Sequence, residues 1–193
     1  MRKSKISFEE KMSWWKGDLF VDDTVELAMS KAYRDLVRTI RGFASNPNHD
    51  LIIYHARQTL YLSVTKILAT AINSQEEFDK LHQSACYELI DSFDDQDFTI
   101  GQAQKWINMT FKYLHLLDYE EVQNVYEYCH VPIDSYILNI TNCILTQPWS
   151  RLNSYREYIG YQKWFRETYP NDIPLDKEFY LWFEENKRQK MAK

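Results

Sequence analysis

Glycine and proline are both scarce in this sequence. Only four glycines and five prolines occur among its 193 residues, whereas all-β folds and doubly wound α/β folds use both residue types at their many turns. The sequence also lacks strand-like alternation of apolar and polar residues, internal repeats and low-complexity linkers. Its longest apolar runs are far shorter than the roughly 18 residues that a transmembrane helix needs. We therefore predict an all-α fold without a membrane-spanning segment.

Residue patterns that hold metals or cofactors are also missing. The three cysteines and five histidines share no metal-ligand spacing. No glycine-rich phosphate loop occurs, and no serine stands in the context of a nucleophile elbow. The odd number of cysteines is typical of reduced thiols in a cytoplasmic protein. We therefore predict no metal, no cofactor and a cytoplasmic location.

An excess of positive charge is absent as well. The formal net charge is −5, which argues against indiscriminate binding to nucleic acids. The charges are nevertheless segregated, because basic residues gather at 31–41, 105–112 and 151–166 while acidic residues gather at 76–97. Such segregation usually marks a solvated surface. The less common interpretation is a groove that faces phosphates.

Apolar residues, by contrast, are plentiful. They make up 45% of the chain, and aromatic residues make up 16%, so the sequence predicts one domain over 1–193 with a substantial core, and we expect a monomer. The segment from Leu51 to about Ile72 is apolar on most of its circumference, which predicts a helix in the centre of the bundle. Residues that favour N-caps predict helix starts at Ser7, Asp22 or Asp23, Asp50, Ser74, Asp134, Ser154 and Asp176.

The stretch Thr99–Ile137 contains the residues that most suggest chemistry. It opens with TIGQAQKWINMTFK, in which a single glycine, Gly101, precedes a strongly helical run. Lys105 and Lys112 are seven residues apart and therefore share one face of this helix. The stretch closes with CHVPIDSY, in which Asp134 starts the next helix. A lone lysine is most often a surface residue, and a lone aspartate after proline is most often an ordinary N-cap, so the spacing alone favours no reaction.

Two of these motifs resemble the helix–hairpin–helix DNA glycosylases, most closely their archaeal 8-oxoguanine branch. Gln104-Lys105 is similar to the start of the helix that follows the hairpin and carries the family's lysine. Val131-Pro132-Ile133-Asp134 is similar to the segment that carries the family's catalytic aspartate. The likeness extends over residues 99–183, with the motifs in the family's order.

The C-terminal part of the likeness lies in the last two helices. Lys112 stands where the archaeal branch has a second lysine, and 161–168 resembles its penultimate helix. Residues 175–182 are similar to its Leu-x-x-Asp-x-x-x-Trp helix, with Glu178 in place of the aspartate and Trp182 at the tryptophan. Two features depart from the family: the hairpin has one glycine instead of two, and residues 1–98, predicted to be helical, show no match.

The resemblance implies a two-lobed helical bundle with a helix–hairpin–helix element and a cleft between the lobes. It implies an enzyme that flips a damaged or modified base out of double-stranded DNA and excises it, with strand cleavage as a further activity. Lys105 would be the nucleophile and Asp134 its catalytic partner. The other implied roles are base binding by Lys112, Glu178 and Trp182, and binding of a DNA phosphate by the backbone amides of Ile100, Gly101, Gln102 and Ala103.

The resemblance also implies a location at the nucleoid, and the longer Glu178 side chain raises the hypothesis that the preferred base differs from 8-oxoguanine. The alternative is a non-catalytic α-helical interaction or regulatory protein. That alternative predicts that Lys105 and Asp134 lie apart, or lie exposed with no pocket beside them. A third hypothesis is a member of the family that binds DNA without cutting it.

Overall fold

The computed structural model describes residues 23–94, 96–143, 145 and 147–191. The predicted all-α fold is confirmed, because these residues form helices and turns and no strand occurs among them. The helix predicted to start at Ser7 lies outside the described residues. The α-helices are α2 (Thr24–Leu36), α3 (His49–Ala69), α4 (Gln75–Asp91), α5 (Ile100–Leu116), α6 (Ser135–Thr141), α7 (Tyr155–Thr168) and α8 (Pro174–Met191). Short 3₁₀ turns are η1 (Val37–Thr39), η2 (Phe43–Ser45), η3 (Glu120–Asn124), η4 (Tyr126–Tyr128) and η5 (Trp149–Arg151).

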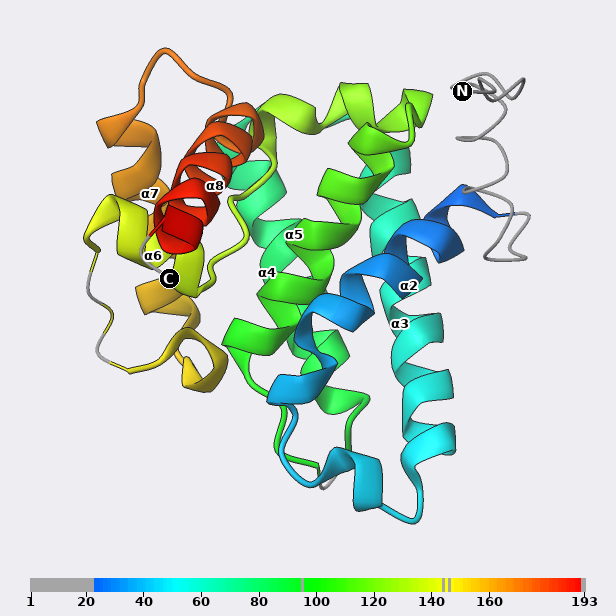
Figure 1. Cartoon of the computed structure of the whole chain (residues 1–193). Helices are drawn as coiled ribbons and strands as arrows, with labels where there is room; N and C mark the ends of the chain where they lie inside the picture. Colours follow the sequence, from blue (N-terminus) through cyan, green and yellow to red (C-terminus); the bar gives the residue numbers. More distant parts are fainter. Residues whose placement is uncertain (1–22, 95, 144, 146, 192–193) are drawn as a thin grey trace, which may run out of the picture.

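Helix α5 occupies the middle of the molecule. Figure 1 shows α2 crossing in front of α5, α3 to one side, and α6, α7 and α8 gathered on the other side. Helices α2 and α4 both pack against α5, and α6 packs against α8. Nearly all of α5 is buried, whereas α3 exposes Leu51, Tyr54 and Leu62. The prediction that the helix beginning near Leu51 is central is therefore wrong, since α3 buries only the side that meets its neighbours.

Several predicted helix starts are confirmed by side-chain caps. Asp23 accepts a hydrogen bond from the backbone N–H of Val25 over 2.7 Å and begins α2. Ser74 and Ser154 accept from the N–H groups three residues later, over 3.3 and 3.2 Å, and begin α4 and α7. Asp134 accepts from the N–H of Ile137 over 3.0 Å and begins α6. Each cap satisfies an N–H group that the first turn of a helix leaves without a partner.

Two other predicted caps are wrong. Asp50 lies in the first turn of α3, which begins one residue earlier. Asp176 lies in the first turn of α8, which begins at Pro174, a residue well suited to the first helical position because it has no N–H to satisfy. The carboxylate of Asp176 instead accepts a hydrogen bond from the Tyr126 hydroxyl over 2.7 Å. This bond ties the start of α8 to η4.

Helix α5 begins in a way that fixes its position. The Thr99 side chain accepts from the N–H of Gln102, and the Gln102 side chain accepts from the N–H of Thr99, so the two form a capping box. A Cβ placed on Gly101 would lie 1.7 Å from the carbonyl oxygen of Trp149, which means that only glycine lets η5 approach α5 so closely. No helix within the described residues has the length and apolar content to cross a membrane.

Candidate functional site

Lys105 and Asp134 form a largely buried ion pair. Lys105 projects from the second turn of α5, and its Nζ lies 2.8 Å from Oδ2 of Asp134, at the start of α6. The two side chains are 6% and 13% exposed, respectively. The other carboxylate oxygen of Asp134 accepts the capping hydrogen bond from α6. The two residues that the sequence singled out, 29 positions apart, therefore meet.

The segment before Asp134 is held by buried amides on α5. Gln104 Nε2 donates to the carbonyl oxygen of Ile133 over 3.0 Å, and Gln104 Oε1 accepts from the N–H of Ile133 over 3.2 Å. Asn108, one turn later, donates to Gln104 Oε1 over 3.0 Å. Since all these groups are buried, each bond is costly to lose. The register of the segment against α5 places Asp134 beside Lys105.

Lys112 and Glu178 form a second buried pair, between α5 and α8. Lys112 Nζ donates to Oε2 of Glu178 and lies 4.3 Å from the centroid of the Phe179 ring. Burial raises the pKa of Glu178, and the charge of Lys112 opposes that effect. The other oxygen, Oε1, has no hydrogen-bond partner among the described residues. A buried polar atom left unpaired in this way is suited to bind a ligand.

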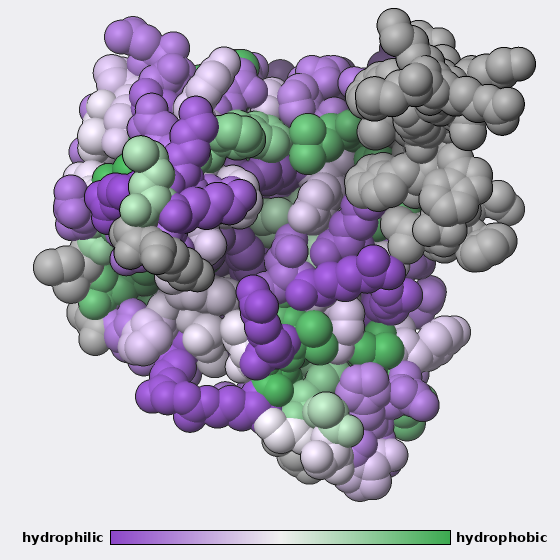
Figure 2. All heavy atoms as spheres, viewed as in Figure 1, coloured by the Kyte–Doolittle hydropathy of each residue, from purple (hydrophilic) through white to green (hydrophobic). Residues whose placement is uncertain are grey.

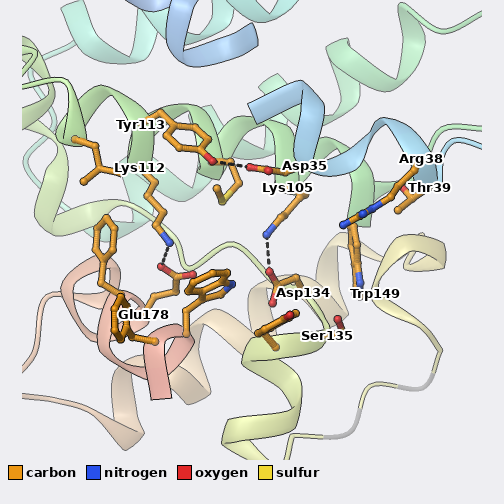
Figure 3. Close-up of a pocket in the computed structure, with 16 residues that line it drawn as sticks. Asp35, Arg38, Thr39, Lys105, Lys112, Tyr113, Asp134, Ser135, Trp149 and Glu178 are labelled. Carbon is orange, nitrogen blue, oxygen red and sulfur yellow. Dashed lines mark hydrogen bonds and ion pairs between the residues drawn. The ribbon is translucent and has the colours of Figure 1, made fainter. Parts of the chain in front are cut away.

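Both pairs line one pocket of about 650 Å³. Figure 3 shows Lys105 pointing from α5 toward Asp134, and Lys112 pointing from the same helix toward Glu178 on the facing α8. Trp182 lines the pocket as well, and its ring stacks on Tyr136 with the centroids 5.4 Å apart. A pocket of this volume accommodates a nucleobase with its sugar. The structure thus brings five predicted site residues to one pocket: Lys105, Asp134, Lys112, Glu178 and Trp182.

Sequence reasoning missed the pocket residues that come from α2 and η1. Asp35, Arg38 and Thr39 line the pocket opposite Asp134, and Asp35 accepts a hydrogen bond from the Tyr113 hydroxyl over 2.9 Å. The sequence showed a basic stretch at 31–41, but polar residues at such spacing on a helix normally face solvent. It therefore did not single out these three residues. The other residues that line the pocket are Met109, Tyr113, Leu116, Ser135, Tyr136, Trp149, Phe179 and Phe183.

The structure does not support the predicted phosphate site at the start of α5. The N–H of Gly101 donates to the carbonyl oxygen of Leu152 over 2.8 Å, and the N–H of Ala103 donates to that of Thr99. The N–H of Gln102 donates to the Thr99 hydroxyl. These residues and Ile100 are buried beneath η5 and its neighbours. The expectation that Ile100, Gly101, Gln102 and Ala103 present amides to DNA is therefore corrected.

The described residues contain no cluster of three or more His, Cys, Asp or Glu side chains that could hold a metal ion. Comparisons with protein-family models, with curated proteins and with solved structures find no match to this chain. The likeness to the DNA glycosylases therefore remains a prediction that depends on the residues themselves.

Proposed function

We propose that this protein is a DNA glycosylase that uses Lys105 as its nucleophile. The observation that carries the proposal is the Lys105–Asp134 pair, with its 2.8 Å contact, on the wall of a pocket large enough for a flipped nucleotide. A nucleophilic lysine needs a neighbour that takes its proton and a site that excludes water. The low exposure of both side chains supports that role.

The far wall of the pocket supports recognition of a base. Trp182 offers an aromatic face for stacking, and the unpaired Oε1 of Glu178 offers a buried partner for a polar atom on the base edge. Lys112 neutralises Glu178 and contributes donors. A flipped base would lie between these groups while its sugar lies beside Lys105.

The proposed reaction begins when Lys105 gives a proton to Asp134. The neutral amine attacks C1′ of the sugar, and the glycosidic bond breaks, so that the base leaves with the bonding electrons and takes up a proton. That proton comes from Asp134, and the carboxylate that is thereby restored stabilises the positive charge that develops on the sugar. Opening of the sugar ring then gives a Schiff base, from which β-elimination cleaves the strand.

The proposal also assigns the helix–hairpin–helix element and the cleft. Helices α4 and α5, joined through residues 92–99, would be the helix–hairpin–helix element, and the pocket would be the cleft between two lobes. Double-stranded DNA would be the partner, at the nucleoid. The alternative of a non-catalytic interaction protein expects Lys105 and Asp134 to lie apart or beside no pocket, so the contact between them argues against it.

The test is a base-release assay on a panel of duplexes, each with one oxidised, alkylated, deaminated or hypermodified base. Mass spectrometry identifies the free base, and hot alkali reveals the abasic site. We expect the native chain to release a base from at least one duplex, and Lys105→Gln to lower that rate by about 1,000-fold or more.

Lys163→Gln is the matched control, since Lys163 is exposed on α7 and outside the pocket. It should release the base at the native rate. Absence of release from every duplex by a folded native chain would contradict the proposal, and binding without release would favour a family member that does not cut DNA.

A further inference from the structure

A second pocket, of about 200 Å³, lies next to the first. Its walls come from three segments that are distant in sequence, around Thr39, Thr99 and Ser150. Every residue that lines it is polar or charged, in contrast to the aromatic walls of the first pocket. A small cavity lined by polar and charged residues suits a hydrated anion better than it suits a base.

Two arginines give this second pocket its charge. Arg41 and Arg151 line it, both are exposed, and neither side chain forms a hydrogen bond or ion pair with another residue of the described part of the chain. Asp97 contributes the single negative charge among its lining residues. Guanidinium groups match a phosphate geometrically, because each can donate two parallel hydrogen bonds to its oxygens.

Hydrogen bonds to the start of α5 hold both segments from which the two arginines project. Gln102 Nε2 donates to the carbonyl oxygen of Thr39 over 2.8 Å and to its hydroxyl over 3.2 Å. The Thr99 hydroxyl donates to the carbonyl oxygen of Ser150 over 3.1 Å. These bonds fix the chain within two residues of Arg41 and directly beside Arg151. The backbone of such a site is already ordered, so ligand binding has only the arginine side chains left to order.

The two pockets share a lining residue. Thr39 lines both of them, and Arg38, its neighbour, lines the first pocket together with Trp149. Figure 3 shows Arg38, Thr39 and Trp149 at the end of the first pocket nearest Lys105 and Asp134. A DNA strand whose sugar lies beside Lys105 would therefore leave the first pocket past Thr39.

We propose that the second pocket binds a backbone phosphate of the strand that carries the flipped nucleotide, through Arg41 and Arg151. This inference rests on the proposed function for the position of the nucleotide. The phosphate ligands would thus be arginine side chains, and not the backbone amides at the start of α5 that the resemblance implied. This site also explains how an acidic chain binds DNA, since the contact is confined to a small basic site next to the reacting sugar.

The first arm of the test measures binding to a duplex with a tetrahydrofuran abasic analogue, which cannot undergo base release. Fluorescence anisotropy compares the native chain with Arg41→Gln/Arg151→Gln over a range of KCl concentrations. We expect the double variant to bind about 10-fold more weakly and its slope of log K against log salt to be smaller by about 1. Arg156→Gln, an exposed arginine outside both pockets, should bind as the native chain does.

The second arm replaces single phosphates near the analogue with uncharged methylphosphonates. One such replacement should weaken binding by the native chain and should have no further effect on the double variant, because both changes remove the same contact. The inference would be overturned if the double variant bound the duplex as tightly as the native chain does. It would also be overturned if the methylphosphonate weakened binding by the double variant as much as it weakens binding by the native chain. A native chain that does not bind the duplex would overturn it as well.

The two proposals fail separately in these experiments. In one outcome the arginine and methylphosphonate changes weaken binding through the same contact, but no duplex loses a base. That outcome would support the phosphate site and refute the glycosylase. In the opposite outcome Arg41→Gln/Arg151→Gln releases the base at the native rate, and methylphosphonates weaken its binding as much as they weaken binding by the native chain. That outcome would support the glycosylase and refute the phosphate site. Both arginines are exposed, so thermal melting should find the double variant folded.

Discussion

At the scale of single residues, Asp134 has two separable tasks. One of its oxygens caps α6, and the other contacts Lys105. Asparagine also caps helices well, but Asp134→Asn leaves the Lys105 charge buried without its partner. We therefore expect it to lower the free energy of unfolding by about 3–5 kcal/mol and to lower base release by about 10²–10⁴-fold. Asp134→Ala should lose about 1 kcal/mol more in stability, through loss of the cap. Urea unfolding and single-turnover base release measure the two quantities, and equal activity of Asp134→Asn and the native chain would exclude a catalytic role.

The buried pair of Lys112 and Glu178 permits a second prediction at this scale. Removal of one partner leaves the other charge buried, so we expect Lys112→Met and Glu178→Leu each to lower the free energy of unfolding by about 3–5 kcal/mol. The double variant should be more stable than either single variant, since a methionine can pack on the Phe179 ring that Lys112 now faces. Urea denaturation of the three variants measures this coupling, and additive losses would show that the two residues act independently.

At the scale of elements, the contact between α5 and η5 depends on Gly101. An added methyl group there would meet the Trp149 carbonyl oxygen, so we expect Gly101→Ala to lower stability by about 1–3 kcal/mol or more. Gly160, in the middle of α7, has open space at the same position. Gly160→Ala should therefore stabilise the chain by about 0.5–1 kcal/mol, as alanine favours helices. Thermal or urea unfolding compares the two, and similar effects at both glycines would contradict this packing.

A buried polar network joins α4, α5 and α7 and gives the stability a pH dependence. His82 lies in this network, 3.0 Å from Asn108 and 3.1 Å from the Tyr155 hydroxyl. Burial, and secondarily the charge of His130, lower the pKa of His82 well below 6.5, the ordinary value. The unfolded chain therefore binds a proton that the folded chain does not, and stability falls as the pH drops below about 6.5.

We expect His82 to contribute about 1.4 kcal/mol of lost stability for each pH unit in that range. His82→Gln should lower stability at neutral pH and flatten its decline between pH 6.5 and 5, whereas His55→Gln, at an exposed position, should leave the slope unchanged. Urea unfolding at several pH values gives the slopes. An unchanged slope in His82→Gln would show that other groups cause the acid sensitivity.

Sequence and structure agree most closely where local rules decide the outcome. Asp23, Ser74, Asp134 and Ser154 begin helices because a cap depends on residues only two or three positions away. The convergence of Lys105 with Asp134 depends on Gln104, whose amide binds a backbone segment 29 residues later. Nothing in the sequence marks Gln104 as that partner, and only the resemblance suggested that the two motifs meet.

The error at the start of α5 has a physical cause. A glycine before a helix suggests free amides for a phosphate, but the same glycine equally permits another segment to approach closely. The N–H of Gly101 is in fact occupied by Leu152. Since Arg41, Arg151 and the start of α5 meet only through tertiary packing, periodicity along one helix could not have located the second pocket.

At the scale of the whole molecule, the pocket joins parts that the sequence keeps apart. Its walls come from α2 and η1, from α5, from the start of α6, from η5 and from α8. Figure 2 shows mainly hydrophilic residues, with smaller hydrophobic areas between them, on the face that Figure 1 presents. With a net charge of −5, nonspecific attraction to DNA should be weak, so binding should depend on the pocket and the nearby arginines.

Borohydride trapping tests the central claim most directly. The native chain, Lys105→Gln and Lys163→Gln are each incubated with sodium borohydride and the duplex panel, and any covalent protein–DNA adduct is located by peptide mass spectrometry. A Schiff base on Lys105 should be reduced to a stable adduct in the native chain and in Lys163→Gln, and no adduct should form with Lys105→Gln. An adduct that persists in Lys105→Gln, or base release by the native chain without any trapped adduct, would contradict the assignment of Lys105 as the nucleophile.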